Sequence, residues 1–147
     1  MRKGYNKISA YLVCRNAVHA VDFYTRHFGA EEDYRLAGSD GIIMHCEMKI
    51  GDCRIMISDE FPDSGVLSPI SIGGTPVSLN IYVDDCDAVF AAMLADGATQ
   101  LSPVEDQFHG DRSGKLVDPY GHIWHIATNK ENLESDEVVA RFAKMMG

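Results

Sequence analysis

The run GKLVDPYGHIWHIAT, residues 114–128, carries the clearest structural signal in this chain. Two apolar runs flank Asp118-Pro119-Tyr120-Gly121, which indicates a tight turn because proline pre-sets its own φ and glycine tolerates a positive one. In the second run, alternation sends Trp124 and Ile126 to one face of a strand and His125 to the other. The run therefore predicts a β-hairpin with a histidine opposite its apolar face.

Size and charge limit the classes to which the protein can belong. The chain has 147 residues and is 46% hydrophobic, which suffices for one core or for two half-units that share one. Its net charge of -9 argues against nucleic-acid and anionic-membrane partners. No apolar run approaches the roughly 20 residues that span a bilayer, and the basic start leads into alternation and not into a signal peptide. We expect a soluble protein.

The four cysteines predict a cytoplasmic location. The cysteines, Cys14, Cys46, Cys53 and Cys86, form no Cys-x-x-Cys pair. Three of them, Cys14, Cys46 and Cys86, fall within predicted strands or a capping turn. Such a pattern favours reduced thiols over a disulfide framework.

The first half of the chain predicts strand, helix and three more strands. Residues 8–14 alternate, Asn16 is a candidate N-cap, and apolar residues follow at helical spacing up to the stop at Gly29. Residues 32–36 are a weak strand candidate. Residues 42–50 and 53–58 alternate as a hairpin, with Met44 expected on the apolar face and Ile43 on the polar one.

The same order returns in the second half. Residues 77–83 alternate, Asp84-Asp85 can cap a helix, and Asp96-Gly97 ends it. Ser9 and Ser78 stand second in their strands, and Met56 and His125 stand fourth in theirs; both pairs are 69 residues apart (78 minus 9, 125 minus 56). The repeat predicts two βαβββ modules.

We therefore expect an α+β fold, in which two modules form a curved mixed sheet around a cleft and carry helices on the outer face. The expected boundaries are 1–60 for the first module, 61–76 for an irregular linker or flap, 77–129 for the second module and 130–147 for a C-terminal helix. Ser135 is the candidate cap of that helix, and its apolar stripe is expected to pack on its own or a partner subunit.

The polar strand faces predict the walls of a small-molecule cleft. Alternation assigns to them Ser9, Tyr11, Val13, Ile43, His45, Glu47, Arg54, Met56, Ser78, Asn80, Tyr82, Ile123 and His125.

Three stretches together resemble a known family: ISAYLVCRNAVHAVDFYTRHFGA, MHCEMKIGDCRIMISDEFP and HGDRSGKLVDPYGHIWHIAT. In this order they resemble the vicinal oxygen chelate superfamily, also called the glyoxalase, bleomycin-resistance and extradiol-dioxygenase fold, and within it the PhnB-like branch. The resemblance implies paired βαβββ modules and a homodimer.

The resemblance also implies where a metal would bind. The ligand positions of metal-using members fall on Ser9, Met56, Ser78 and His125, of which His125 alone is a good ligand for a divalent transition metal. We therefore expect no cofactor, and a divalent metal is not favoured. No glycine-rich nucleotide loop supports the methyltransferase label that PhnB-like sequences have carried.

Three groups are candidates for chemistry. His125 is either a ligand-binding or acid-base residue or a histidine satisfied by neighbouring backbone. His45 and Glu47 are either an acid-base pair or alternative metal site, or part of an exposed polar sheet face. In the predicted loop His109-Gly110-Asp111-Arg112, Arg112 either clamps an anionic ligand or pairs with Asp111.

Two functions stay open at this point, beside a duller role as an interaction module. The leading one is a homodimeric protein that binds a small organic molecule without a tightly held metal. The alternative is a lyase, isomerase or transferase-like enzyme that uses His125, or His45 with Glu47, as general base. Asp118, Pro119 and Gly121 are expected to be structural turn residues, and Trp124 to be core.

Overall fold

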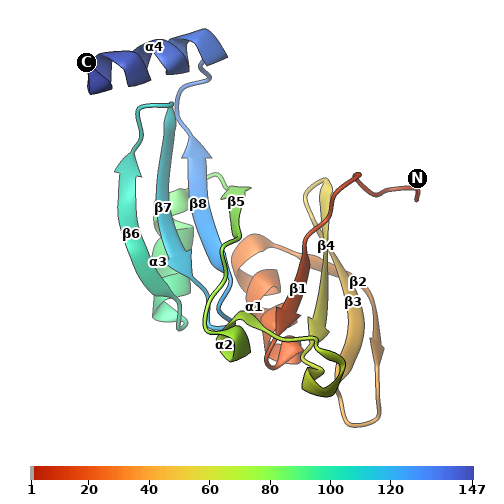
Figure 1. Cartoon of the computed structure of the whole chain (residues 1–147). Helices are drawn as coiled ribbons and strands as arrows, with labels where there is room; N and C mark the ends of the chain where they lie inside the picture. Colours follow the sequence, from red (N-terminus) through yellow and green to blue (C-terminus); the bar gives the residue numbers. More distant parts are fainter. Residues whose placement is uncertain (1) are drawn as a thin grey trace. The chain divides into compact units, whose positions relative to one another are not determined.

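The computed structural model describes residues 2–147 and shows eight strands in two separate four-stranded sheets, each with a helix against one face (Figure 1). The predicted α+β class and the two βαβββ modules are confirmed. The chain divides into two compact units. Met1–Pro76 with Tyr120–His122 form the first, and Val77–Pro119 with Ile123–Gly147 form the second.

The first unit has the strand order β1-β4-β3-β2, in which β1 is parallel to β4 and the other pairs are antiparallel. Its elements are β1 (Tyr11–Cys14), α1 (Ala17–Phe28), β2 (Glu31–Ala37), β3 (Ile43–Ile50) and β4 (Cys53–Asp59). The weak strand candidate at 32–36 is therefore confirmed as β2. We call the sheet face opposite the helix the open face of each unit.

Alternation along β1 and β4 builds the first core. Leu12, Cys14, Ile55 and Ile57 are buried on the face that α1 covers. The helix contributes its own buried stripe of Ala17, Ala20, Val21, Phe23 and Tyr24. Each fully buried aliphatic side chain contributes about 1.5–3 kcal/mol to folding, so the helix-facing side of the sheet is the main source of stability in this unit.

A buried carboxylate at the end of β4 fixes the start of α1. Asp59 Oδ1 accepts a hydrogen bond from the backbone N–H of Ala17 at 2.8 Å, and Oδ2 accepts one from Ile43 at 2.8 Å. Asn16 occupies the cap position with a left-handed φ of 67, but its side chain makes no capping bond. The predicted capping role of the Asn16 side chain is thus wrong, because Asp59, distant in sequence, satisfies the helix N-terminus.

A bulge in β3 changes which side chains face the core. Leu36 pairs with His45 and Ala37 pairs with Ile43, so Met44 is an extra residue opposite β2. Ile43 is 0% exposed and Met44 is 57% exposed. The expected placement of these two residues is therefore wrong, since a strict two-residue period fails wherever a strand carries an inserted residue.

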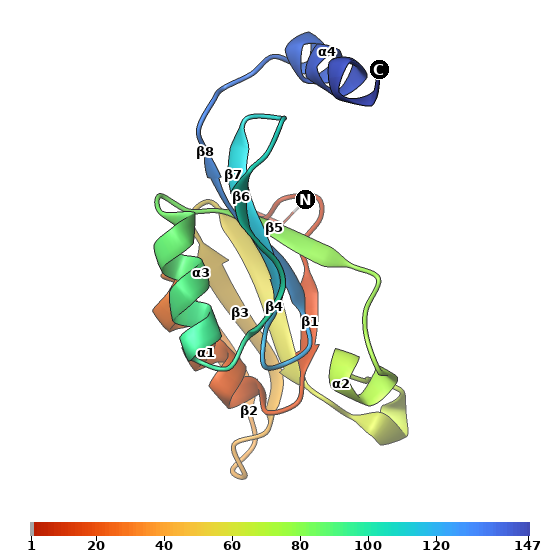
Figure 2. The same cartoon turned by 90° about the vertical axis from the view of Figure 1, so that its left-hand side faces the viewer.

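The segment between the modules has regular structure, contrary to the expected irregular linker. It contains a 3-10 helix, η1 (Pro62–Ser64), and a one-turn helix, α2 (Pro69–Ile72). Proline supplies the first turn of each, and the Ser68 hydroxyl caps α2. Figure 2 shows α1 on one side of the first sheet and this segment on the other.

The second unit repeats the arrangement with the order β5-β8-β7-β6. Its elements are β5 (Ser78–Tyr82), α3 (Cys86–Ala95), β6 (Thr99–Asp106), β7 (Asp111–Val117) and β8 (Ile123–Asn129). Thr128 Oγ1 accepts a hydrogen bond from the N–H of Cys86 at 2.9 Å. Asp59 and Thr128 are 69 residues apart (128 minus 59), as are Ala17 and Cys86 (86 minus 17), so both helices are capped from the same place in the repeat.

The hairpin of β7 and β8 has the predicted turn between its strands. Trp124 is 3% exposed, as expected of a core residue, and its indole Nε1 donates to Asp118 Oδ2 at 2.9 Å. Asp118 thus has a structural role in this turn, as predicted. None of the four cysteines, all of which lie within residues 2–147, forms a disulfide.

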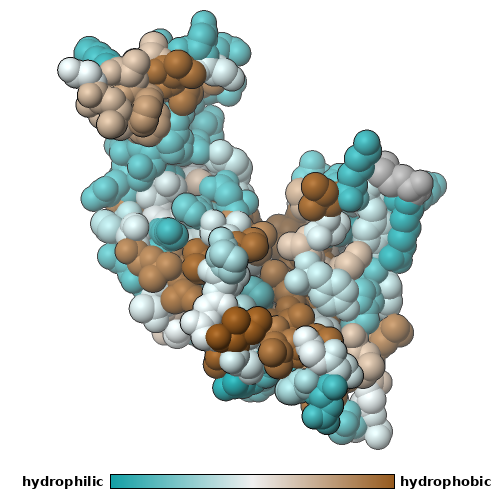
Figure 3. Space-filling model, viewed as in Figure 1, coloured by the Kyte–Doolittle hydropathy of each residue, from teal (hydrophilic) through white to brown (hydrophobic). Residues whose placement is uncertain are grey.

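The last helix, α4 (Ser135–Met146), follows β8 and starts one residue earlier than expected. Ser135 is the first helical residue, and Glu134 takes the cap position without a side-chain bond. Its apolar residues are exposed in this unit (Figure 3): Val139, Phe142, Met145 and Met146. No helix within residues 2–147 has the length and hydrophobicity of a membrane span.

Candidate functional site

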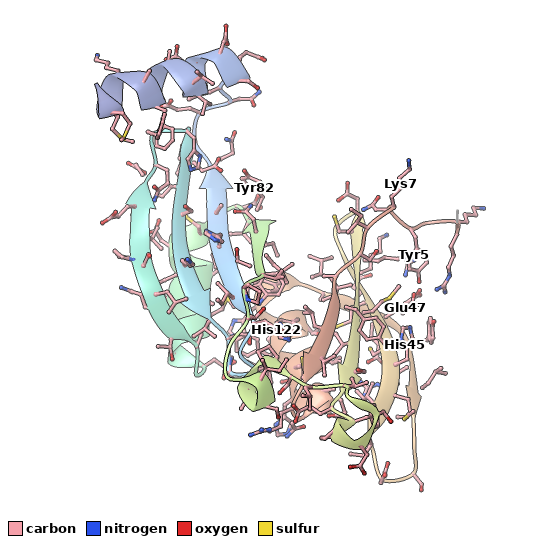
Figure 4. The ribbon with its side chains drawn as sticks, in the orientation of Figure 1. Tyr5, Lys7, His45, Glu47, Tyr82 and His122 are labelled. Carbon is pink, nitrogen blue, oxygen red and sulfur yellow. The ribbon has the colours of Figure 1, made fainter. Side chains whose placement is uncertain are left out.

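A buried carboxylate lies on the open face of the first sheet. Glu47 is 0% exposed, although its position in β3 points it away from α1. Its cross-strand neighbours are Met56 on β4 and Tyr34 on β2. Figure 4 shows Glu47, His45 and Tyr5 together on this side of the sheet.

Three side chains converge on one oxygen of Glu47. Oε1 accepts from Arg2 Nη1 at 2.9 Å and from the Tyr34 hydroxyl at 2.8 Å, and it lies 3.1 Å from His45 Nε2. Among residues 2–147, the other oxygen, Oε2, is buried without a hydrogen-bond partner. The expectation that His45 and Glu47 form an exposed polar sheet face is therefore wrong.

His45 connects this carboxylate to Tyr11 of β1. The Tyr11 hydroxyl lies 2.6 Å from His45 Nδ1. In a neutral imidazole, Nε2 must carry the proton because it faces the carboxylate, and Nδ1 then accepts from the tyrosine. Burial raises the pKa of Tyr11, which keeps its hydroxyl protonated near neutral pH. The three groups form a hydrogen-bonded relay from the sheet centre to β1.

The segment that precedes β1 covers the Glu47 site. The Arg2 guanidinium lies 4.2 Å from the centre of the Tyr5 ring, and the Arg54 guanidinium lies 4.9 Å from it. Arg54 donates to the backbone oxygen of Gly4 at 3.1 Å and to Asp33 at 2.6 Å. Arg54, a predicted ligand-binding residue, therefore holds the covering segment in place.

Two hollows flank the relay within the first unit. One, of about 430 Å³, is mainly apolar and is lined by Tyr11, Val13, Met44, Ser58, Phe61, Ser64 and Val66. The other, of about 510 Å³, is lined by Arg2, Tyr5, Asn6, Lys7, Ser9 and Met56. Tyr11 belongs to both the relay and the apolar hollow, which we call the Tyr11 pocket.

The open face of the second sheet carries His125 in a polar row. Asn80 and Lys115 are its cross-strand neighbours on β5 and β7. Burial, and secondarily the charge of Lys115, lowers the pKa of His125, so its imidazole is neutral near neutral pH. The alternative of a histidine satisfied by backbone is not realised, because the imidazole of His125 makes no hydrogen bond with another residue in the range 2–147. Ser78 and Asn80 are both exposed on β5.

The remaining predicted residues of this unit do not join that row. Tyr82 donates to Asp111 Oδ2 at 2.7 Å, and His109 Nδ1 lies 3.7 Å from the same oxygen. Arg112 lies in β7, not in a loop, and donates to the carboxylates of Asp87 on α3 and of Asp106.

Arg112 therefore lies on the helix side of its sheet. The alternative pair of Arg112 with Asp111 is not formed, because Asp87 and Asp106 bind the guanidinium instead. Helix α3 supplied a carboxylate that strand alternation could not reveal.

The residues at the ligand positions that the resemblance implies do not suit a divalent transition metal. Ser9 and Ser78 offer hydroxyls and Met56 a thioether, which bind divalent transition ions weakly. Within the described part of the chain, no three His, Cys, Asp or Glu side chains come together as a metal-binding group. The buried carboxylate of the first open face, Glu47, already contacts a guanidinium.

Several site residues were missed by sequence reasoning. Tyr34 lies in a strand too weakly patterned to assign a face, and Met44 depends on the bulge. Arg2 precedes the first strand and carries no periodic signal at all. Phe61 and Val66 lie in a segment that was expected to be irregular, where an isolated β-bridge pairs them.

Comparison with known proteins places this geometry in a family. The model of the Glyoxalase/Bleomycin resistance protein/Dioxygenase superfamily matches residues 7–126. An uncharacterized protein of Mycobacterium bovis is 38% identical over 136 residues, which cover 90% of each chain.

Solved structures have the same fold at low sequence identity. A putative 3-demethylubiquinone-9 3-methyltransferase, PhnB protein, from Bacillus cereus has a TM-score of 0.66 at 21% identity, covering 84% of this chain and 99% of its own. The fosfomycin resistance protein FosX from Listeria monocytogenes has a TM-score of 0.64 at 16% identity, covering 90% and 97%. The predicted superfamily is confirmed, and a PhnB protein is among the similar folds.

Proposed function

Because this chain belongs to the Glyoxalase/Bleomycin resistance protein/Dioxygenase superfamily, we propose that it binds a small organic molecule on the open face of its first sheet, without a tightly held metal. One observation carries the proposal: the Tyr11 hydroxyl stands where the apolar Tyr11 pocket meets the His45 and Glu47 relay. A mainly apolar hollow with a few directed polar groups is typical of small-molecule sites.

The pocket lining indicates which chemical groups the ligand carries. Val13, Met44, Phe61 and Val66 offer contact to an apolar body. When the Tyr11 hydroxyl donates its hydrogen bond to His45 Nδ1, its oxygen keeps free lone pairs. The ligand group that meets Tyr11 is therefore a hydrogen-bond donor, such as a hydroxyl or an amide N–H.

Isothermal titration of the metal-free protein against small aromatic molecules tests the proposal. Met44→Glu should abolish binding of any ligand found, because it places a charge against apolar surface. Tyr11→Phe should weaken binding about 5- to 30-fold through one lost hydrogen bond. Gln100→Ala, on exposed β6, serves as the control. Unchanged affinity in both pocket variants, or binding that requires an added divalent ion, rejects the proposal.

The proposed protein is a cytoplasmic homodimer with no nucleic-acid partner. The family resemblance supports the dimer, the free thiols support the location, and the charge of -9 opposes binding to polyanions. Light scattering after size exclusion should give about twice the chain mass of 16.2 kDa. Elution as a monomer at micromolar concentration rejects the dimer, and cell fractionation tests the location.

The relay favours a second candidate, an enzyme of the lyase or isomerase type. Tyr11 would exchange a proton with the bound molecule, while His45 and Glu47 supply and orient the partner base. His125 is the corresponding candidate on the second open face. If Tyr11 is the proton-exchanging residue, Tyr11→Phe should lower turnover about 100-fold or more, with little change in the binding of an apolar ligand. Stoichiometric binding without turnover rejects the enzyme and retains the binding function.

A further inference from the structure

Two buried polar atoms of the first unit have no hydrogen-bond partner among residues 2–147. They are Glu47 Oε2 and the hydroxyl oxygen of Tyr5. The Glu47 side chain is 1% exposed, so water offers this carboxylate little solvation. A buried carboxylate is costly unless a cation and hydrogen bonds compensate it, and here only one of its oxygens is engaged.

The cation beside Glu47 comes from the covering segment and is largely exposed. The Arg2 side chain is 58% exposed and its Nη1 reaches only Oε1. Guanidinium groups bind carboxylates most strongly through two parallel hydrogen bonds, and this geometry leaves that arrangement unused. Arg2 therefore uses only one of the two carboxylate oxygens that Glu47 offers to a cation.

Aromatic rings complete the surroundings of a cation. Tyr5 stacks under the Arg2 guanidinium, and the Tyr34 hydroxyl donates to Glu47. The rings of Tyr11 and Tyr34 lie 5.4 Å and 5.9 Å from the His45 ring. Ring faces beside a carboxylate attract ammonium and guanidinium groups, so this cluster has the composition of an organic-cation site.

We infer that Glu47 is the cation-binding subsite of the ligand pocket, and that Arg2 occupies it as a tethered stand-in until a ligand bearing a guanidinium or ammonium group displaces it. The inference rests on the proposed function, because His45 joins Glu47 to Tyr11 on the pocket wall. The ligand class is thus an amphiphilic organic cation, with an apolar body in the Tyr11 pocket and its charged end at Glu47.

Titration calorimetry with a matched pair of probes tests the inference on the full chain. Phenethylguanidine carries the cation, and phenethylurea has nearly the same shape without the charge. The variants are Arg2→Ala, which removes the stand-in, and Glu47→Gln, which removes the charge of the site. Lys3→Ala is the control, because it deletes an exposed cation of the same segment.

The guanidine should bind Arg2→Ala about 5-fold more tightly than the unaltered protein, since the Arg2 side chain, 58% exposed, competes only modestly for Glu47. Glu47→Gln should weaken guanidine binding about 10-fold or more and remove the preference over the urea. Lys3→Ala should match the unaltered protein. If Glu47→Gln does not fold, Arg2→Ala decides alone, because its side chain is mostly exposed.

The results separate this inference from the proposed function. Equal binding of the two probes in every variant, with both weakened by Tyr11→Phe, overturns the cation subsite and leaves the pocket standing. A guanidine affinity that Arg2→Ala does not raise also overturns it. Absence of binding by either probe and by the aromatic library, in both the unaltered protein and Arg2→Ala, overturns both.

Discussion

Replacing the buried Asp59 by alanine should destabilise the first unit more than replacing an exposed carboxylate does. The side chain is 8% exposed, and each of its oxygens accepts a backbone N–H at 2.8 Å, one from Ala17 and one from Ile43. Alanine leaves both donors without an acceptor. It also removes a negative charge from the start of α1, where that charge interacts favourably with the helix dipole.

The magnitude follows from the two orphaned donors. Each hydrogen bond to a charged group contributes about 1.5–3 kcal/mol, so the loss of two in Asp59→Ala should lower the free energy of unfolding by about 3–6 kcal/mol. Asp59→Asn retains one acceptor oxygen and should cost roughly half of that. Thr128→Val is the matched control, because Thr128 accepts one helix N–H at the equivalent repeat position, and it should cost about 1–2 kcal/mol.

Urea unfolding followed by circular dichroism and by tryptophan fluorescence measures these losses. The chain has one tryptophan, Trp124, which belongs to the second unit, so a loss confined to the dichroism transition locates the damage in the first. Because Asp59 also holds the N–H of Ile43 next to the bulge, ligand binding at Met44 should weaken as well. A cost of Asp59→Ala below about 1 kcal/mol, or no larger than that of Thr128→Val, refutes the capping role.

Three further predictions concern packing and pH. Met48→Ala should lower the free energy of unfolding by about 2–5 kcal/mol in thermal or urea unfolding, because the side chain is fully buried. Met44→Ala should lower it by less than about 0.5 kcal/mol and should weaken ligand binding. The reverse order of the two losses would contradict the bulge. Gly114→Ala should cost about 1–3 kcal/mol, since its Cβ would lie 2.7 Å from Phe90 Cε2, and an unchanged melting temperature would contradict this packing. Hydrogen bonds from Ser68 lower the pKa of Glu60 from 4.5 to about 2, so Glu60→Gln should cost about 1–2 kcal/mol above pH 5, and this difference should vanish as the pH falls toward 2; a difference that persists at pH 2 would contradict it.

The parts of the fold that could be predicted are those governed by short-range pattern. Alternation placed Trp124 in the core and His125 on the open face, because successive strand residues point to opposite sides. The repeat of 69 residues predicted two modules, and the equivalent capping positions of Asp59 and Thr128 agree with it. Tight-turn chemistry at Asp118 likewise depends on neighbouring residues alone.

The parts that failed depend on partners distant in sequence. Arg112 was assigned to a ligand because its carboxylate partner on α3 lies 25 residues away. Asn16 was assigned the cap of α1, although a carboxylate 42 residues away from Ala17 provides it.

The sequence by itself determined the order of the strands and of helices α1, α3 and α4, the internal repeat and the family, since each of these follows from local periodicity and spacing. Tertiary structure alone decided the character of the first open face. Glu47 alternates as a surface residue should, yet Arg2 and Tyr34 cover it. Burial of a side chain is set by what other segments place above it, and no period along its own strand can report that.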